Sequence, residues 1–528
     1  MKKLSIILLL LCCALASAQN VEKWGCFEAS FEATAKGNPF QTDFSATFSN
    51  GVESFNVDGF YDGNGIYKLR FMPDAEGVWT YTTKSSLKAL DGKKGSFTCT
   101  KANNKGPVRV SGTHFAYADG TAYYPVGTTA YSWMHAPGDY PQRTLNSLKE
   151  SGFNKIRCLF FIQNISAAGS EADAEEARIF PYEKKADGSW DFDRPNPAYY
   201  QKVEQKILDL QRIGVECDLI LFHPYDKGRW GFDSMPQEAN LKYLKYLISR
   251  VSAFRNVWWS LANEFDYSKA KSLDDWAELI ACVNENDPYG HLCSIHGSTA
   301  TYYPYWNEGL SHCSIQDQSP VDAQGKAAIV KHIYSKPTIF DEVCYEGNLP
   351  RRWGNLSGQE MLYRMYCGIL SGCYVTHAEC FNLDGGNNEE QSTNYLAYGG
   401  DFHGESWKRI NFLQNVLKGL PGPLDLADSS WDPRTSTAGE GYYLVYLGKD
   451  APSEWTFSIP QKNFIYTRPS EGEKYKVKVL DTWNMTTKEC DTIFETTKSG
   501  NYLLHDIQER SVELPSLPYI LLIIKRLQ

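Results

Sequence analysis

The 528-residue chain lacks a basic excess, a long apolar run beyond its first residues, and the usual patterns of a metal or nucleotide site. Its 63 acidic residues outnumber its 53 lysines and arginines, and the net charge of -10 excludes nucleic acid as an expected partner. No run after residue 18 reaches the ~20 apolar residues of a membrane helix. No CxxC or His-x-His pair occurs, and no glycine-rich loop follows an early strand. We therefore expect no metal, no cofactor and no membrane span.

Residues 1–18 have the pattern of a cleaved signal peptide. Two lysines precede a short apolar core, and small residues end the segment at Ala18. Cys12 and Cys13 follow too few apolar residues to favour a lipid anchor. We expect a secreted or periplasmic protein, in which disulfides are permitted. Cys26 and Cys99 could then pair, although their spacing alone does not decide this.

The rest of the chain is too long for one core, and its pattern of apolar and polar residues divides it into three parts. Residues 21–105 alternate apolar and polar residues between turn dipeptides, which predicts an immunoglobulin-like β-sandwich. Residues 425–528 return to short strand-like runs and predict a second β-sandwich. Aromatic residues make up 14% of the chain; they fill β-cores and also stack against sugars.

Residues 108–420 alternate short apolar runs with helix-like segments. In the clearest helix, Asn196 is the expected N-cap and Gly214 the expected C-cap. The eight alternations predict a (β/α)8 barrel, with an open doubly wound sheet as the alternative. The eight expected strands are Tyr124–Gly127, Lys155–Phe160, Glu216–Phe222, Val257–Leu261, Leu292–Ile295, Cys313–Ile315, Pro337–Phe340 and Cys373–Thr376.

Carboxylates follow two of these strands, and catalytic groups gather at the carboxyl ends of barrel strands. Strand four runs straight into Asn263-Glu264, and strand seven into Asp341-Glu342. These two strand ends face each other across a barrel mouth. Glycosidic bond cleavage needs such a pair, because one carboxyl protonates the leaving oxygen while the other attacks the anomeric carbon or activates water.

The stretches "WWSLANEFD" at 258–266 and "KPTIFDEVCYEGN" at 336–348 resemble the clan A retaining glycoside hydrolases. Within that clan the chain looks most like the apiosidase-like glycosidases, which have an immunoglobulin-like domain before the barrel and a β-sandwich after it. The resemblance implies that Glu264 is the general acid/base, Glu342 the nucleophile, and Asn263 a ligand of a sugar hydroxyl. It also implies that Arg157, in strand two, lies near the nucleophile.

Glu346 competes with Glu342 for the role of nucleophile. Glu342 is preferred because it directly follows the apolar strand, where the backbone is rigid. Asp341 is expected to point away, since neighbours in a strand face opposite sides. Glu346 is then expected to bind substrate or to position Tyr345.

Other residues near the strand ends are expected to line a substrate pocket walled by aromatic rings. Strand three runs into "FHPYD", which offers His223, Tyr225 and Asp226. Long inserts at 161–195 and 378–405 are expected to shape the mouth and weakly favour action at a chain end. The predicted substrate-binding set is Asn263, Arg157, Tyr131, Trp133, His223, His296, Gln316, Asp317, Tyr345, Glu346 and His377.

These observations predict a glycosidase that acts on a plant-type or other complex poly- or oligosaccharide. Three alternatives stay open. A metal-dependent barrel hydrolase would need His223, His296 and His377 to gather. A barrel that only binds carbohydrate would keep the aromatic residues without using the carboxylates. Inversion, in place of retention, would use the same two carboxylates further apart.

Overall fold

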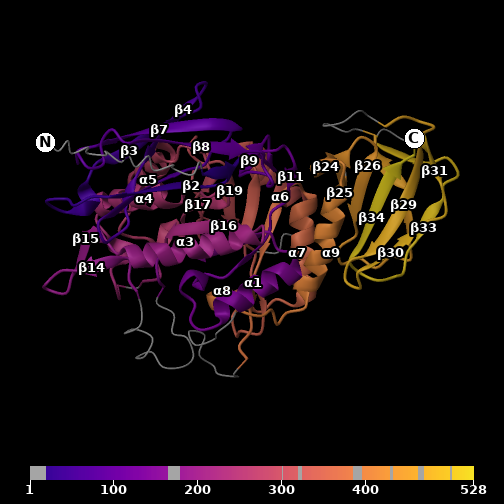
Figure 1. The fold of residues 1–528 in the computed structure, drawn as a ribbon. Helices are drawn as coiled ribbons and strands as arrows, with labels where there is room; N and C mark the ends of the chain where they lie inside the picture. Colours follow the sequence, from indigo (N-terminus) through magenta and orange to yellow (C-terminus); the bar gives the residue numbers. More distant parts are fainter. Residues whose placement is uncertain are drawn as a thin grey trace, which may run out of the picture. The chain divides into compact units, whose positions relative to one another are not determined.

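The computed structural model describes residues 19–163, 179–226, 228–299, 301–318, 324–383, 395–428, 432–461, 469–499 and 502–527 (Figure 1). The chain forms two compact units, residues 1–104 and 105–528. The expected signal peptide, 1–18, lies outside the described residues. The long inserts at the barrel mouth likewise run into 164–178 and 384–394, outside the description.

The N-terminal unit is built from two β-sheets. One has the strand order β1 (Asn20–Glu22), β8 (Lys94–Thr100), β7 (Gly77–Ser85), β3 (Phe44–Ser49) and β4 (Ser54–Asp58). The other has the order β2 (Phe27–Glu32), β6 (Ile66–Phe71) and β5 (Phe60–Tyr61). Aromatic rings from both sheets fill the core, where Phe48 stacks on Phe71 at 4.3 Å and Phe27 on Phe97 at 4.2 Å. Cys26 and Cys99 are separate thiols, so the pairing that the sequence allowed is not made.

Eight parallel strands form the central barrel. Their order in the sheet is β18 (Cys293–Ser294), β17 (Val257–Ala262), β16 (Glu216–Phe222), β13 (Lys155–Leu159), β12 (Val126–Thr129), β22 (Tyr374–His377), β20 (Thr338–Glu342) and β19 (Cys313–Gln316). A parallel bridge between His296 and Ser314 joins the two outer strands and closes the ring. The central (β/α)8 barrel between two β-rich domains, expected from the sequence, is confirmed.

Helices follow most of the barrel strands. They are α1 (Tyr140–Ser151), α3 (Pro197–Arg212), α4 (Gln237–Val251), α5 (Leu273–Asn286), α6 (Gln324–Tyr334), α7 (Gly358–Leu370), α8 (Tyr395–Tyr398) and α9 (Ser406–Lys418). The side chain of Asn196 caps α3 by accepting from the backbone N–H of Ala198, as the sequence predicts. After β18 the described part of 297–312 has no helix. A hairpin of β14 (Tyr182–Lys184) and β15 (Trp190–Pro195) precedes α3.

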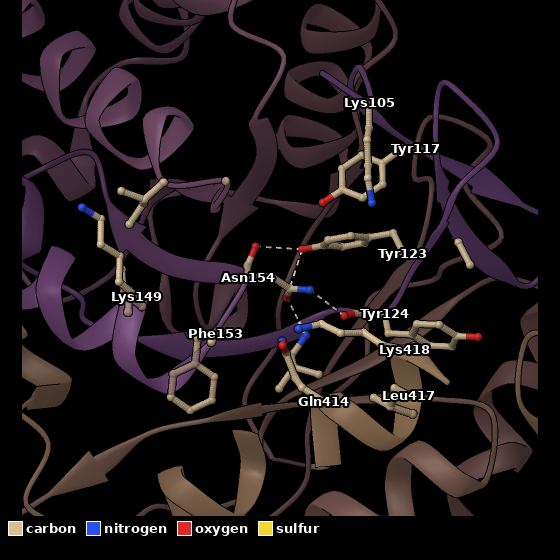
Figure 2. A pocket seen from close by; sticks show the side chains of 16 residues that line it. Lys105, Tyr117, Tyr123, Tyr124, Lys149, Phe153, Asn154, Gln414, Leu417 and Lys418 are labelled. Atoms are coloured by element: carbon tan, nitrogen blue, oxygen red, sulfur yellow. Dashed lines mark hydrogen bonds between the residues drawn. The ribbon is translucent and has the colours of Figure 1, made fainter. Parts of the chain in front are cut away.

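The amino ends of the barrel strands are closed by aromatic residues. A three-stranded sheet of β9 (Val108–Ser111), β10 (His114–Tyr117) and β11 (Ala122–Tyr123) supplies Phe115 and Tyr123, which pack with Trp258 and Tyr374. Beside them is a cavity of about 370 Å³, where the Tyr123 hydroxyl donates to the backbone oxygen of Asn154 at 3.0 Å (Figure 2). This cavity belongs to the end of the barrel opposite the carboxylates.

The C-terminal β-rich domain is built around one apolar cluster that includes Tyr443, Phe457, Tyr475 and Phe494. Its largest sheet has the path β24 (Asp425–Asp428), β25 (Asp432–Gly439), β26 (Tyr442–Tyr446), β34 (Ile520–Arg526), β29 (Lys474–Asp481), β31 (Phe494–Ser499), β32 (Leu503–Asp506) and β28 (Ser458–Pro460). Strand β30 (Thr486–Glu489) pairs with β29, and β27 (Glu454–Thr456) pairs with β33 (Ser511–Glu513). None of the helices in the described ranges has the length and apolar character needed to cross a membrane.

Candidate active site

The apolar strand β17 is followed by an amide, Asn263, and a carboxylate, Glu264, where the chain turns. Glu264 has a left-handed backbone (φ 48°, ψ 56°), which a non-glycine residue adopts at a cost of about 1–3 kcal/mol. This conformation ends the strand and turns the chain into a short 3-10 helix, Phe265–Tyr267. Asn263 stays fully buried, whereas Glu264 is half-buried. Strained backbone of this kind persists where the surrounding structure holds it, often at functional sites.

Glu342 lies at the carboxyl end of β20 and is 5% exposed. Three donors surround its Oε1 atom. The hydroxyl of Tyr131 donates to it, His296 Nε2 lies 3.5 Å away, and Arg157 Nη1 lies 3.7 Å away. Arg157 lies within β13, while Tyr131 and His296 follow β12 and β18, so the barrel itself assembles the surroundings of Glu342.

Asp341 does not point away from the site as the strand alternation predicted. In the pairing of β19 with β20, Gln316 is opposite Glu342 and Ile315 is opposite Phe340, so Asp341 is an extra residue in the register. Arg157 Nε lies 3.7 Å from Asp341, the same separation that its Nη1 keeps from Glu342. The bulge therefore turns both acids of the strand end toward the same arginine.

Beneath the carboxylate pair is a buried ion cluster in the barrel interior. Lys155 Nζ donates to Asp218 and to Asp341, at 2.8 Å each, and all three residues are at most 3% exposed. Ser314 and Thr376 also donate to Asp341, at 2.6 and 2.7 Å. Burial alone would raise the pKa of Asp341, but Lys155 and Arg157 hold it far below its usual range.

Glu264 is held by a neighbour that follows strand β16. The hydroxyl of Tyr225 donates to Glu264 Oε2 at 2.7 Å, and Asn263 Nδ2 donates to the same hydroxyl at 2.5 Å. The other end of the Asn263 amide accepts from Arg157 Nη2 at 2.9 Å. The rings of Tyr131 and Tyr225 are 6.5 Å apart, which links the surroundings of the two carboxylates.

The two carboxyl groups have opposite electrostatic settings. Burial and the charge of Glu342 raise the pKa of Glu264, against the lowering effect of Tyr225, His296 and Gln316. Burial would also raise the pKa of Glu342, but His296, Arg157 and Tyr131 together bring it below its usual range. The arrangement makes Glu264 the carboxyl group that is more readily protonated and Glu342 the one that is more readily ionised, which suits an acid and a nucleophile or base.

Several predicted residues lie in this group or in its wall. Gln316 lies close enough to Glu264 to lower its pKa, and the backbone N–H of Asp317 donates to the Glu342 carbonyl at 2.9 Å. Tyr345 packs in one apolar cluster with Tyr131. The structure thus brings together Glu264, Glu342, Asn263, Arg157, Tyr131, His296, Gln316, Asp317 and Tyr345.

His223 lies one layer behind the carboxylates. Its Nε2 atom is 3.2 Å from the Phe161 carbonyl, and its Nδ1 accepts the backbone N–H of Tyr225 at 3.1 Å. Burial lowers the pKa of His223 to about 4, so the ring is neutral at pH 7. The imidazole also stacks on the Tyr225 ring at 5.5 Å, so His223 fixes Tyr225 and makes no contact with either carboxylate.

Trp133 and His377 are not brought to the carboxylate pair. Trp133 is fully buried, with the ammonium of Lys206 4.7 Å from its ring. In β22 the Thr376 side chain points inward to Asp341, so the alternation of the strand turns His377 outward. There His377 pairs with Thr128 at 3.1 Å and stacks on Phe153, and burial lowers its pKa to about 3.

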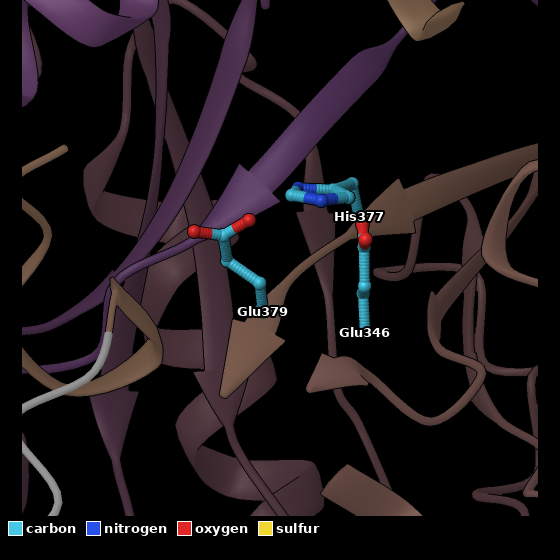
Figure 3. A group of neighbouring side chains, drawn as sticks. All are labelled: Glu346, His377 and Glu379. Atoms are coloured by element: carbon cyan, nitrogen blue, oxygen red, sulfur yellow. The ribbon is translucent and has the colours of Figure 1, made fainter. Parts of the chain in front are cut away.

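Glu346 also lies outside the pair. Its carboxylate accepts the backbone N–H groups of Glu405 and Ser406 at the start of α9, at 2.6 and 3.1 Å. Its neighbour Glu379 accepts backbone N–H groups from residues 403 and 404. Glu346, Glu379 and His377 come within 4.8 Å of one another (Figure 3), yet both carboxylates already serve as acceptors for this segment. The three histidines that a metal hydrolase would gather do not meet, because only His296 faces Glu342.

The barrel matches a family model. Residues 110–376 match the model described as "Apiosidase-like, catalytic domain". The chain belongs to the apiosidase-like family. Residues 20–86 and 431–525 match two domains of unknown function, DUF5060 and DUF5605. A solved structure of a putative glycoside hydrolase from Bacteroides vulgatus ATCC 8482 is 49% identical, has a TM-score of 0.91, and matches over 96% of this chain and 100% of that one.

The family and this similarity make the apiosidase-like chain a glycosidase. The structure of a family 5 glycoside hydrolase from the same organism is 14% identical over 80% of this chain and 94% of that one. Its TM-score of 0.57 shows a shared fold. The comparison with curated proteins gives no match.

Proposed function

We propose that the chain hydrolyses O-glycosidic bonds of a complex poly- or oligosaccharide with retention of the anomeric configuration. Glu264 is the general acid/base and Glu342 the nucleophile. The observation that carries this proposal is that the surroundings of the two carboxyl groups at the barrel mouth shift their pKa values in opposite directions. The pKa of Glu264 is raised and that of Glu342 is lowered. From the pattern of residues 1–18 we place this activity outside the cytoplasm.

In the first step Glu264 gives its proton to the glycosidic oxygen while Glu342 attacks the anomeric carbon. The carbon–oxygen bond of the leaving group breaks, and an ester forms between the sugar and Glu342. In the second step Glu264 takes a proton from water, the water oxygen attacks the anomeric carbon, and Glu342 leaves as a carboxylate. Tyr131, His296 and Arg157 suit Glu342 for this role, because they stabilise the carboxylate that enters and leaves the reaction.

Glu342 is preferred to Glu346 as the nucleophile because the two carboxylates have different contacts. Glu342 accepts from Tyr131 and its charge acts on Glu264, whereas the Glu346 oxygens accept backbone N–H groups at the start of α9. Gln316, Asp317 and Tyr345 remain as proposed substrate contacts around the pair.

Azide rescue tests both roles on a substrate found with a panel of aryl glycosides. Glu342→Gly and Glu264→Ala are each expected to lose at least a hundredfold in turnover. With azide, Glu342→Gly should give a glycosyl azide of inverted configuration, and Glu264→Ala one of retained configuration. Near-normal turnover of Glu342→Gly, or inversion by the wild-type enzyme, would contradict the assignment. Glu308→Gln, which changes an exposed acid in the loop after β18, is the matched control.

A further inference from the structure

A chain of side-chain contacts connects the two carboxylates through three residues. Arg157 lies 3.7 Å from Glu342 and donates to Asn263 Oδ1 at 2.9 Å. Asn263 Nδ2 donates to the Tyr225 hydroxyl at 2.5 Å, and that hydroxyl donates to Glu264 Oε2 at 2.7 Å. Each link comes from a different barrel strand or from the residues that follow it.

Arg157 determines the direction of every hydrogen bond in this series of contacts. A guanidinium has donors and no acceptor, so the Asn263 atom beside Arg157 must be the amide oxygen. The amide nitrogen therefore faces Tyr225 and donates to its hydroxyl. Because a tyrosine hydroxyl has one hydrogen and Asn263 cannot accept it there, this hydrogen points to Glu264 Oε2. Oε2 must then be an acceptor.

We propose that Tyr225 is a positioning residue that keeps the acid proton of Glu264 on its other oxygen, Oε1. This inference rests on the proposed role of Glu264 as the general acid. If the proton were on Oε2, its hydrogen and the Tyr225 hydroxyl hydrogen would point at each other. If the Tyr225 hydrogen turned away from Glu264, it would point at the N–H of Asn263. Arg157 therefore orients the acid proton through Asn263 and Tyr225, without touching Glu264.

The remaining groups around Glu264 are compatible with this arrangement. The charged or titratable neighbours are Glu342 on β20, His296 after β18 and Tyr225 after β16, and Gln316 on β19 lies close enough to lower the pKa of Glu264. The Tyr225 bond favours the ionised form of Glu264, while Glu342 favours the protonated form. Tyr225 itself is held in place, since its backbone N–H donates to His223 Nδ1 and the two rings stack.

Tyr225→Phe tests the proposal, because it removes one oxygen and keeps the ring. The first measurement needs no substrate. Enzyme labelled with ¹³C at the glutamate carboxyl groups is titrated by NMR, and Glu264→Gln identifies the signal of Glu264. We expect the pKa of Glu264 to rise further in Tyr225→Phe, since the carboxylate loses a donor. An unchanged pKa would overturn the proposal.

Kinetics on aryl glycosides provide the second readout. Tyr225→Phe should lose about tenfold to a hundredfold in kcat/KM for poor leaving groups, within the ~10²–10⁴ that a general acid contributes. The loss should be small for 2,4-dinitrophenyl glycosides, which leave without a proton. An equal loss for all leaving groups would indicate general disturbance of the site and would overturn the positioning role.

Two further variants keep the test decisive. Tyr123→Phe removes a buried hydroxyl at the opposite end of the barrel and should leave both readouts unchanged. Asn263→Asp offers Tyr225 an acceptor, so its hydroxyl turns away from Glu264, and it also adds a negative charge nearby. Both effects raise the pKa of Glu264, whether or not Tyr225→Phe folds. An unchanged pKa there also counts against the proposal. Wild-type enzyme that hydrolyses no glycoside would refute the proposed function alone, because the titration still reports the hydrogen-bond chain.

Discussion

Replacing Lys155 by Met tests the ion cluster on which the carboxylate pair rests. Lys155 is fully buried and donates to Asp218 and Asp341 at 2.8 Å each. The variant leaves these two acids with Arg157 as their remaining ion-pair partner, at 3.8 and 3.7 Å. Removing one partner of a buried ion pair typically costs about 3–5 kcal/mol. Because Arg157 still compensates in part, we expect the free energy of unfolding to fall by about 3 kcal/mol at pH 7.

The assay is urea unfolding followed by circular dichroism, with Lys245→Met on the exposed side of α4 as the control. We expect the control to stay within about 0.5 kcal/mol of the wild type. Asp341 has a lowered pKa, so its contribution to stability is present above its unfolded pKa and is lost as the pH falls. In Lys155→Met the pKa of Asp341 should rise, and the deficit should shrink toward pH 4. A deficit below about 1 kcal/mol, or one that grows as the pH falls, would refute this reasoning.

Three further predictions concern activity. The rate should fall as the pH rises through the raised pKa of Glu264 and as it drops through the lowered pKa of Glu342; a profile that stays flat up to pH 9 would contradict the assignment of Glu264. Tyr131→Phe removes a donor from Glu342, so the acid limb of the pH–rate profile should move to higher pH, and an unmoved limb would separate Tyr131 from the nucleophile. Dialysis against EDTA should leave kcat unchanged, whereas a loss that Zn²⁺ or Ca²⁺ restores would favour a metal-dependent hydrolase.

The sequence predicts most of the barrel because hydrophobic rhythm and strand ends are local properties. The expected strand Glu216–Phe222 contains the apolar run Leu219–Phe222, and the strand has the same bounds in the structure. Asn196 before Pro197 predicts the start of α3 for the same reason, since capping depends on neighbouring residues. The polar sequence of helix α1, YPQRTLNSLKES, shows only a narrow apolar stripe, so the sequence alone gives little indication of this helix.

The candidate site depends on contacts between residues far apart in the sequence, so the sequence predicts it less well than the barrel. Glu264 and Glu342 could be identified because each directly follows a strand. The bulge at Asp341 depends on pairing between β19 and β20, which no single stretch reveals. His377 was expected at the mouth, although Thr376 occupies the inward position of that strand.

Tyr225 shows what sequence reasoning can miss at such a site. It lies in the "FHPYD" stretch, from which only His223 entered the predicted substrate-binding set. The hydroxyl reaches Glu264 only because the chain turns after β16, with the ring held against His223. The available signal was the presence of several polar residues after one strand, which identifies the stretch and leaves the choice of residue open.

Trapping the covalent intermediate tests the central claim most directly. The enzyme is incubated with a 2-deoxy-2-fluoro glycoside of the sugar that it hydrolyses, which slows the second step more than the first. We expect the intact mass to rise by one fluoroglycosyl group and peptide mapping to place that group on Glu342. A label on Glu346, or turnover with inversion and no label, would contradict the account.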